Sequence, residues 1–500
     1  MKLQFGKDSI VGCVLFLYSI FLALLSESVA YLTMCYLSIL DIALVAVYVA
    51  SKRIKFYDSR FIFLLIVILY TISQNLVYPL VAGSREYYYS VLYTLHHYSD
   101  ERMQIASLCT LLCINTLAIV LFFGRRTLKA SPLARAAEEE AENPITLPDE
   151  RRLRIIRVMA AVLFCLSAPL MLYKMFVYVR LFLRTGYGES AKSLLPSVVI
   201  SASPFFFTAV ILGTTVNLAQ KRKNVFYDVA IVVYVAYSML IGDRGGGICF
   251  ALFRIWEGIT FRSGARKMRF SFKWVALIAA GIVLFFAAMQ FVRTYRNAYS
   301  HDFFEVIRLS FQELTRSNFI LKDLLEFGGS MYPLNETIGK MSAEGEPFAY
   351  GAQYLDFFIN MLPSTFGVNS LYPHLAKWLT GSTEFAGHGF SIIAEGYYNF
   401  GEFAWIAMVP IGLVVRKVYY WDEGRRDSFY KIMVTALCMC FMGDIARRSI
   451  AQFGFTCLWY IILPVLVAKR FSFSYEPKTL RNESGEKRQT VRVRAERSRV

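Results

Sequence analysis

The 500-residue chain has little charge for its length, and it lacks the motifs of soluble nucleotide and metal enzymes. Charged residues make up 18% of the chain, whereas 56% of its residues are hydrophobic. No G-x-G-x-x-G, Walker A or His-Glu-x-x-His pattern occurs, so a dinucleotide, ATP or zinc-protease signature is missing. Soluble domains have about 45–50% apolar residues, so this composition excludes most classes of soluble enzyme.

No cysteine lies outside the apolar runs, so a disulfide framework in the segments between them is excluded. All nine cysteines fall inside apolar stretches, and none lies in residues 293–402. Disulfides usually hold small external domains together, so that segment must be held by packing instead. The closest pairs, Cys109 with Cys113 and Cys438 with Cys440, lack the spacing of a metal site. We expect small buried hydrophobic residues and predict no metal site.

Long apolar runs dominate what the sequence does contain. A helix needs about 20 apolar residues to cross a hydrocarbon core about 30 Å thick, and a helix satisfies its own backbone polar groups in lipid. We therefore predict an all-α integral membrane protein with about twelve spanning helices. The predicted spans are 9–26, 30–50, 61–81, 104–124, 158–180, 197–219, 226–242, 246–261, 274–292, 403–420, 428–446 and 452–468.

The basic residues behind the net charge of +17 lie mainly in the loops between these spans. Lys and Arg gather in alternate loops, at residues 52–60, 125–129, 221–223, 262–269 and 416–426, and ten more lie in the tail 469–500. Cytoplasmic loops of membrane proteins have such an excess, so we place these loops and both termini in the cytoplasm. The same rule explains the basic charge of a protein embedded in the lipid bilayer, without a nucleic-acid partner.

One segment on the opposite side is much longer than the others. Residues 293–402, called the external segment below, combine helix-like stretches with Gly, Pro and Ser turn signals, which predicts a mostly helical cap. The predicted organisation is nine spans in 1–292 with a cytoplasmic linker at 125–157, the external segment, three spans in 403–468, and a basic disordered tail 469–500.

One histidine of the external segment has a distinctive setting. His388 lies between Gly387 and Gly389, just before the tenth predicted span. Glu395 follows two helical turns later, so a helix would place both side chains on one face. A histidine near pH 7 can take a proton from a substrate hydroxyl. The pair is a candidate acid–base site, and the alternative is an interfacial histidine that caps the last helix.

Three arginine clusters lie at the external ends of predicted spans. They are Asp243 and Arg244 before glycines 245–247, Arg293 with Arg296, and Arg447 with Arg448. The glycines predict a sharp turn that opens a helix and favours an anion. Charges at membrane depth tend to be paired or functional, and guanidinium groups bind phosphate in a bidentate manner. We predict that the clusters jointly hold a phosphate-bearing lipid head; the alternative is local pairing with Asp243 or Asp444.

Four charged residues interrupt the apolar runs: Asp41, Lys174, Arg254 and Glu257. Arg254 and Glu257 are three residues apart and can pair on one helix. A proton or ion pathway is the other interpretation, and we favour local pairing.

These features together resemble one family. The specific stretches are GDRGG at 242–246 and GHGFSIIAEGYYNFGEF at 387–403. A many-span protein with these stretches and a long external segment resembles the Wzy-type O-antigen polymerases, which join oligosaccharide repeat units. The resemblance implies an enzyme of the bacterial inner membrane, a fold related to the GT-C membrane glycosyltransferases, and an active face in the periplasm.

The resemblance also implies a reaction and its partners. A growing glycan on undecaprenyl diphosphate would be transferred to the terminal sugar of a newly flipped lipid-linked repeat unit, without a cofactor or a metal. His388 would bind or deprotonate the acceptor hydroxyl, with Glu395 orienting it or acting as the base. The residues that would hold the diphosphate and stabilise the leaving group are Arg244, Arg293, Arg296, and Arg447 or Arg448. The sugars, the linkage and the presence of a chain-length regulator stay open.

Three other functions fit part of the pattern. An O-antigen ligase shares the overall plan but passes the glycan to the lipid A core. A flippase for the lipid-linked unit, a transporter, spans the membrane a similar number of times, but the long external segment argues against it. A non-catalytic scaffold would not require arginine clusters at one face.

Overall fold

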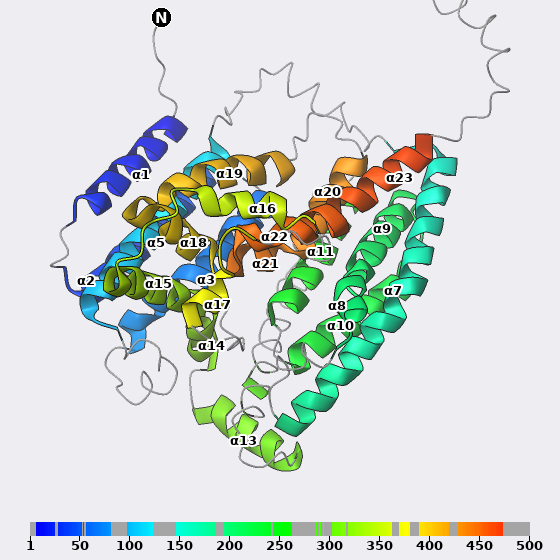
Figure 1. The fold of residues 1–500 in the computed structure, drawn as a ribbon, viewed down its shortest axis with the longest axis horizontal. Helices are drawn as coiled ribbons and strands as arrows, with labels where there is room; N and C mark the ends of the chain where they lie inside the picture. Colours follow the sequence, from blue (N-terminus) through cyan, green and yellow to red (C-terminus); the bar gives the residue numbers. More distant parts are fainter. Residues whose placement is uncertain are drawn as a thin grey trace, which may run out of the picture.

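The chain forms a bundle of helices. The computed structural model describes residues 7–25, 29–52, 54, 57–81, 98–123, 147–185, 195–241, 244–262, 287, 290–291, 294, 303–316, 319–362, 370–380, 390–419 and 429–473. Within these ranges the regular structure is helical throughout, with no strand, so the all-α prediction is confirmed. The first helix, α1 (Lys7–Ala23), and the long helix α7 (Glu150–Thr185) lie at opposite edges of the molecule (Figure 1).

Six helices are long and apolar enough to cross a membrane. They are α2 (Tyr31–Ser51), α3 (Ser59–Val81), α5 (Asp100–Phe122), α7, the pair α8–α9 within Ser197–Ala219, and the final run Ile450–Arg470. Shorter apolar helices cover other predicted spans: α1, α10 (Val225–Leu240) and α20 (Phe429–Cys440). The predicted span 274–292 lies almost entirely outside the described residues, and the total of twelve stays a prediction.

The start of α7 lies inside the predicted linker, whose cytoplasmic placement stays a prediction. Residues 150–157, which were assigned to the end of the linker 125–157, belong to the helix. Leu153 and Ile156 are three residues apart and both are buried, so the charged stretch ERRLRIIR has an apolar stripe at helical spacing. Packing of that stripe extends the helix beyond the membrane-length run. The rest of the linker, up to residue 146, lies outside the described residues.

Two predicted spans are interrupted. Residues 197–219 form α8 (Ser197–Ala202) and α9 (Phe205–Ala219), and the break falls at Pro204, whose ring and missing N–H prevent a continuous helix. Residues 428–446 form α20 and then α21 (Met442–Arg447), separated at Phe441. The second break matters for the site, because it sets the direction of the last turn before Arg447.

The outer surface of the bundle is apolar. On α7, Leu166 is 67% exposed and Phe176 is 64% exposed, and on α10, Phe226 is 62% exposed and Val232 is 66% exposed. Soluble monomers rarely expose contiguous apolar surface on this scale, whereas a lipid-facing helix requires it. This surface supports an integral membrane protein.

The external segment is mostly helical in its described residues, as predicted. Its helices are α13 (Phe303–Arg316), α14 (Phe319–Phe327), α15 (Met331–Glu344), α16 (Asp356–Ile359), α17 (Leu375–Thr380) and α18 (Ile392–Phe400). Short 3₁₀ turns occupy Gly328–Ser330, Ala352–Leu355 and Gly401–Phe403.

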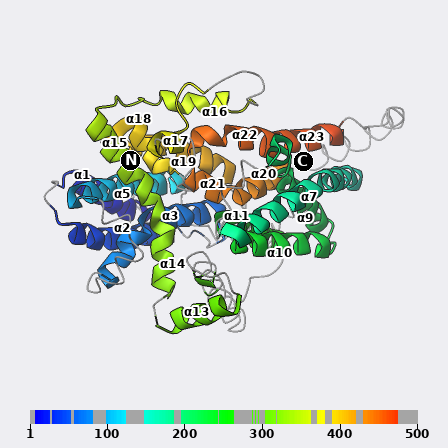
Figure 2. The same cartoon turned by 60° about the horizontal axis from the view of Figure 1, so that its bottom comes forward.

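Most of this segment packs on the N-terminal helices. Helices α14 and α15 pack on α3, α15 and α18 pack on α5, and α17 packs on α15 (Figures 1 and 2). The Tyr98 hydroxyl donates to Glu336 Oε1 at 2.5 Å, and Gln74 Nε2 donates to the Leu325 carbonyl at 3.3 Å. These bonds tie residues far apart in the sequence, so the segment forms part of the folded core.

Candidate functional site

The external segment and two helices of the bundle converge on α21. This short helix packs against α3, against α11 (Arg244–Arg262) and against α18. The Phe390 amide N–H, at the start of the α18 region, donates to the Arg447 carbonyl at 3.0 Å. The structure therefore brings together the start of α11, the Arg447–Arg448 cluster and the chain that follows His388.

Arg447 is held by an aromatic ring. Its guanidinium carbon lies 5.2 Å from the centre of the Tyr70 ring, and its side chain is exposed. Tyr70 belongs to α3 and is itself buried, so the ring is a fixed platform for a cation–π contact. Among the described residues no carboxylate forms an ion pair with Arg447. A guanidinium positioned in this way suits an anionic ligand.

The neighbouring Arg448 is different. Its Nη2 lies 3.2 Å from Asp444 Oδ1, and the two side chains are 59% and 34% exposed. The local pairing considered as the alternative for this cluster therefore holds for Arg448 with Asp444. A pair this exposed contributes about 0–1 kcal/mol to stability.

The glycines after Arg244 serve close helix packing. They lie in the first turn of α11, so the sharp turn predicted at glycines 245–247 is wrong: the helix begins at Arg244 and includes them. A Cβ on Gly245 would lie 3.4 Å from the Tyr70 hydroxyl and 4.0 Å from Arg447 Nη1. The Gly247 amide donates to Ser238 Oγ at 3.0 Å. The first turn of α11 therefore lies directly beside Arg447 and its ring.

Gly443 sets the approach of α21 to α11. Its amide donates to Cys249 Sγ at 3.1 Å, and a Cβ on Gly443 would lie only 2.8 Å from that sulfur. Small residues let membrane helices approach this closely. The contact holds α21, and with it Arg447, against the start of α11.

Adding one methyl group here should disrupt the site. We expect Gly443→Ala to push α21 away from α11 and to reduce product formation by about 10²-fold, the effect of misplacing a binding group by roughly 1 Å. Cys249→Ala removes the clashing sulfur, so the double variant Gly443→Ala/Cys249→Ala should recover activity. Polymer yield at matched protein level measures both. Failure of the double variant to recover would contradict the proposed contact.

Five predicted site residues have no described side chain. Asp243, Arg293, Arg296 and His388 lie in undescribed residues, and Arg244 is described by its backbone, where α11 begins. One neighbour is placed: Phe291 packs against Phe182 of α7, as do Leu240 and Ile241 at the end of α10. Phe291, two residues before Arg293, and Ile241, two residues before Asp243, therefore both pack against Phe182.

Glu395 is fully buried in α18. Its Oε1 accepts from the Ser449 hydroxyl at 2.6 Å and from the Ala451 amide at 3.1 Å, and its Oε2 accepts from the Ile450 amide at 2.6 Å. Burial raises the pKa of this carboxyl to about 7, and the hydrogen bonds from 449–451 limit the rise. The described contacts link Glu395 to the turn after Arg447; its predicted contact with His388 stays a prediction.

The local sequence explains where α18 begins. The Ser391 side chain accepts the Ala394 amide at 3.1 Å, as an N-cap residue does. That cap ends the GHGF stretch and starts the helix, so Glu395 falls in the first turn of α18 and faces the turn 449–451.

Two residues of the site had no signal strong enough to be selected from the sequence. Tyr70 precedes a polar run, Thr71 to Asn75, that interrupts an apolar span, and such an interruption is the only hint. Ser449 adjoins the arginine pair but carries no motif. Among the described residues, no group of three His, Cys, Asp or Glu side chains is placed to hold a metal ion.

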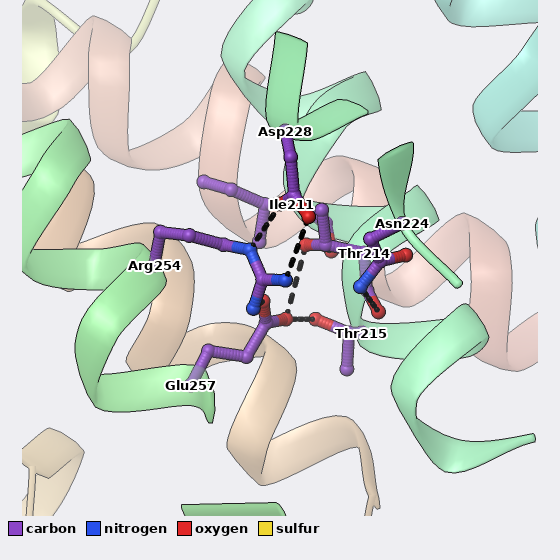
Figure 3. Close-up of polar contacts among 7 residues, drawn as sticks. All are labelled: Ile211, Thr214, Thr215, Asn224, Asp228, Arg254 and Glu257. Atoms are coloured by element: carbon purple, nitrogen blue, oxygen red, sulfur yellow. Dashed lines mark hydrogen bonds and ion pairs between the residues drawn. The ribbon is translucent and has the colours of Figure 1, made fainter. Parts of the chain in front are cut away.

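A second polar cluster lies farther along α11, away from Arg447. Arg254 Nε lies 2.6 Å from Asp228 Oδ1 of α10, and Arg254 Nη1 lies 3.7 Å from Glu257 Oε2 (Figure 3). The hydroxyls of Thr215 and Thr214 donate to Glu257 Oε1 at 2.6 and 3.1 Å. The predicted local pairing of Arg254 with Glu257 is confirmed, and the cluster joins α9, α10 and α11.

Comparison with known proteins gives one family match. Residues 9–474 match the family model described as O-antigen polysaccharide polymerase Wzy. No curated protein and no solved structure gives a match.

Proposed function

Because the chain belongs to the family of Wzy O-antigen polysaccharide polymerases, we propose that it polymerises undecaprenyl-diphosphate-linked oligosaccharide repeat units at the periplasmic face of the bacterial inner membrane. The product is O-antigen or a related surface polysaccharide. The basic loops and both termini then lie in the cytoplasm, and the α21 site lies at the opposite face.

One observation supports this assignment most strongly. The Arg447 guanidinium is fixed on the Tyr70 ring beside the first turn of α11, with no carboxylate partner among the described residues. The first N–H groups of a helix have no partner within it and favour an anion. A guanidinium next to such a turn matches a diphosphate, which is the charged part of the lipid-linked donor.

The proposed reaction develops negative charge on its leaving group, which arginine side chains can stabilise. The acceptor hydroxyl oxygen forms a bond to the anomeric carbon of the donor glycan, while the bond from that carbon to the diphosphate oxygen breaks. Arg447 and Arg244, with Arg293 and Arg296, stabilise the charge that develops on the departing undecaprenyl diphosphate. The hydroxyl proton passes to His388. The donor linkage supplies the energy, so the reaction requires no nucleotide.

The histidine role can be tested in cells and with purified protein. His388→Ala should lower the rate by about 10²–10⁴-fold, the usual contribution of a general base. The strain should then make lipopolysaccharide with a single repeat unit while protein level stays normal. His374→Ala, which changes another histidine of the external segment, is the matched control and should leave long chains.

The deletion strain separates the other functions. A polymerase deletion leaves single-repeat lipopolysaccharide, a ligase deletion leaves bare core, and a flippase deletion accumulates repeat units on the cytoplasmic leaflet. Either of the last two results would overturn the proposal. Full-length chains from both His388→Ala and Arg244→Ala would overturn the residue roles while leaving the polymerase assignment intact.

A further inference from the structure

Glu395 uses its whole carboxylate to bind one turn of the chain. Both oxygens accept hydrogen bonds, and three donors come from the consecutive residues Ser449, Ile450 and Ala451, with the Gln353 side chain as a further partner. None of the side chain is exposed. A group that removes a proton from a substrate must come within hydrogen-bond distance of it, whereas this carboxylate is enclosed by the protein's own donors.

The bound turn directly follows the arginine of the site. Arg447 ends α21, Arg448 is extended, and the turn begins at Ser449. The Phe390 amide also donates to the Arg447 carbonyl. The α18 region therefore holds this stretch at two places, on either side of Arg448. One contact is the hydrogen bond from Phe390 to the Arg447 carbonyl, and the other is the set of hydrogen bonds from the turn to Glu395.

Other buried polar groups complete the frame. Gln353 Nε2 donates to Ser449 Oγ at 3.4 Å, and Asn399 Nδ2 donates to Gln353 Oε1 at 3.2 Å. On the other side, Asn360 Nδ2 donates to the Ala451 carbonyl at 3.0 Å. The turn 449–451 is thus hydrogen-bonded to Gln353, Asn360 and Glu395. All three belong to the external segment, so this segment determines the position of the turn.

We propose that Glu395 is a positioning residue: it anchors the turn 449–451 and so keeps Arg447 over Tyr70, beside the first turn of α11. The proposal rests on the proposed function, because it assumes that Arg447 binds the diphosphate of the donor. It assigns Glu395 a role that acts through Arg447, and it leaves proton transfer to another group.

A double-mutant cycle separates positioning from proton transfer. Two residues that act through one another show non-additive effects. In the reconstituted enzyme with a lipid-diphosphate-linked repeat unit, Glu395→Gln should lower kcat/KM by about 10²-fold, with a raised KM for the donor. In an Arg447→Lys background, which has already lost the bidentate fork, the same change should cost about twofold or less. Equal fold losses in both backgrounds would overturn the proposal and favour a base.

A structural readout makes the test independent of activity. Hydrogen–deuterium exchange of a peptide covering residues 444–452 should speed up in Glu395→Gln, because one carboxylate oxygen becomes an NH2 group and no longer accepts from the turn, while the remaining oxygen binds its donors without a negative charge. Unchanged exchange would overturn the proposal. Glu402→Gln, at an exposed position just after α18, is the control and should change neither exchange nor kcat/KM.

Two further results keep the outcome interpretable. If Glu395→Gln does not fold, Ser449→Ala removes one of the three donors and should give the same non-additivity with Arg447→Lys at a smaller amplitude. If the unaltered protein makes no polymer from the lipid-linked unit, the proposed function fails, independently of the result for Glu395→Gln. Faster exchange at 444–452 in that case would still show the anchor.

Discussion

Arg447→Ala is expected to reduce polymer formation by about 10²–10³-fold, the loss that follows removal of one preorganised donor to a developing anion. The structure supplies the reason. The guanidinium is already placed on the buried Tyr70 ring before substrate binds, so little side-chain freedom is lost when the diphosphate arrives. Initial rates of chain extension in proteoliposomes, with a lipid-linked repeat unit as both donor and acceptor, measure the effect.

Conservative changes distinguish geometry from charge. Arg447→Lys keeps the positive charge but loses the planar fork that binds two phosphate oxygens, so its rate should fall between those of the unaltered protein and Arg447→Ala. Tyr70→Leu removes the ring beneath the guanidinium, and we expect a raised KM for the donor. Unaltered rates in Arg447→Ala would show that the diphosphate binds elsewhere.

Arg448 and Arg308 provide matched comparisons. Arg448 is adjacent to Arg447 in the chain but pairs with Asp444, so we expect Arg448→Ala to reduce the rate far less. Arg308 is an exposed arginine on α13 of the external segment, and Arg308→Ala should have no effect. A loss in Arg448→Ala as large as that in Arg447→Ala would mean that both arginines of the cluster bind the substrate.

The helices were largely predictable from the sequence because the signal is local. Spans predicted at 30–50 and 61–81 correspond to α2 (Tyr31–Ser51) and α3 (Ser59–Val81). Hydrophobicity and length are properties of one segment, and lipid requires that segment to satisfy its own backbone. The interruption at Pro204 and the extension of α7 to Glu150 were missed, since a length-based rule does not weigh a proline or an amphipathic stripe outside the core.

The site was only partly predictable because its contacts are long-range. The arginine clusters could be selected from their unusual position, but nothing in the sequence couples Arg447 to Tyr70 in α3. The seven-residue spacing from His388 to Glu395 indicated a shared helical face. The structure shows Glu395 bound by residues 449–451, a pairing that depends on how α18 packs beside α21, and the contact with His388 stays a prediction.

Arg254→Ala is expected to destabilise the bundle strongly. Glu257 has none of its surface exposed, and Arg254 is its ionic partner at 3.7 Å (Figure 3). Removing one partner of a buried pair costs about 3–5 kcal/mol, because the other charge is left uncompensated. The hydroxyls of Thr214 and Thr215 donate to one carboxylate oxygen and cannot replace a cation. The thermal unfolding midpoint in detergent and the yield of folded protein measure the loss.

The cause of that loss can be isolated by neutralising the carboxylate first. Glu257→Gln keeps an oxygen that accepts from Thr215 and removes the buried charge, so on its own it should change stability by much less. In the Glu257→Gln background, Arg254→Ala should then cost only a fraction of its effect in the unaltered protein. Asp228 is 43% exposed, so Asp228→Asn should cost about 1 kcal/mol or less. If Arg254→Ala is equally damaging with Gln at position 257, Arg254 stabilises the bundle through packing of its alkyl chain, and the ion pair contributes little.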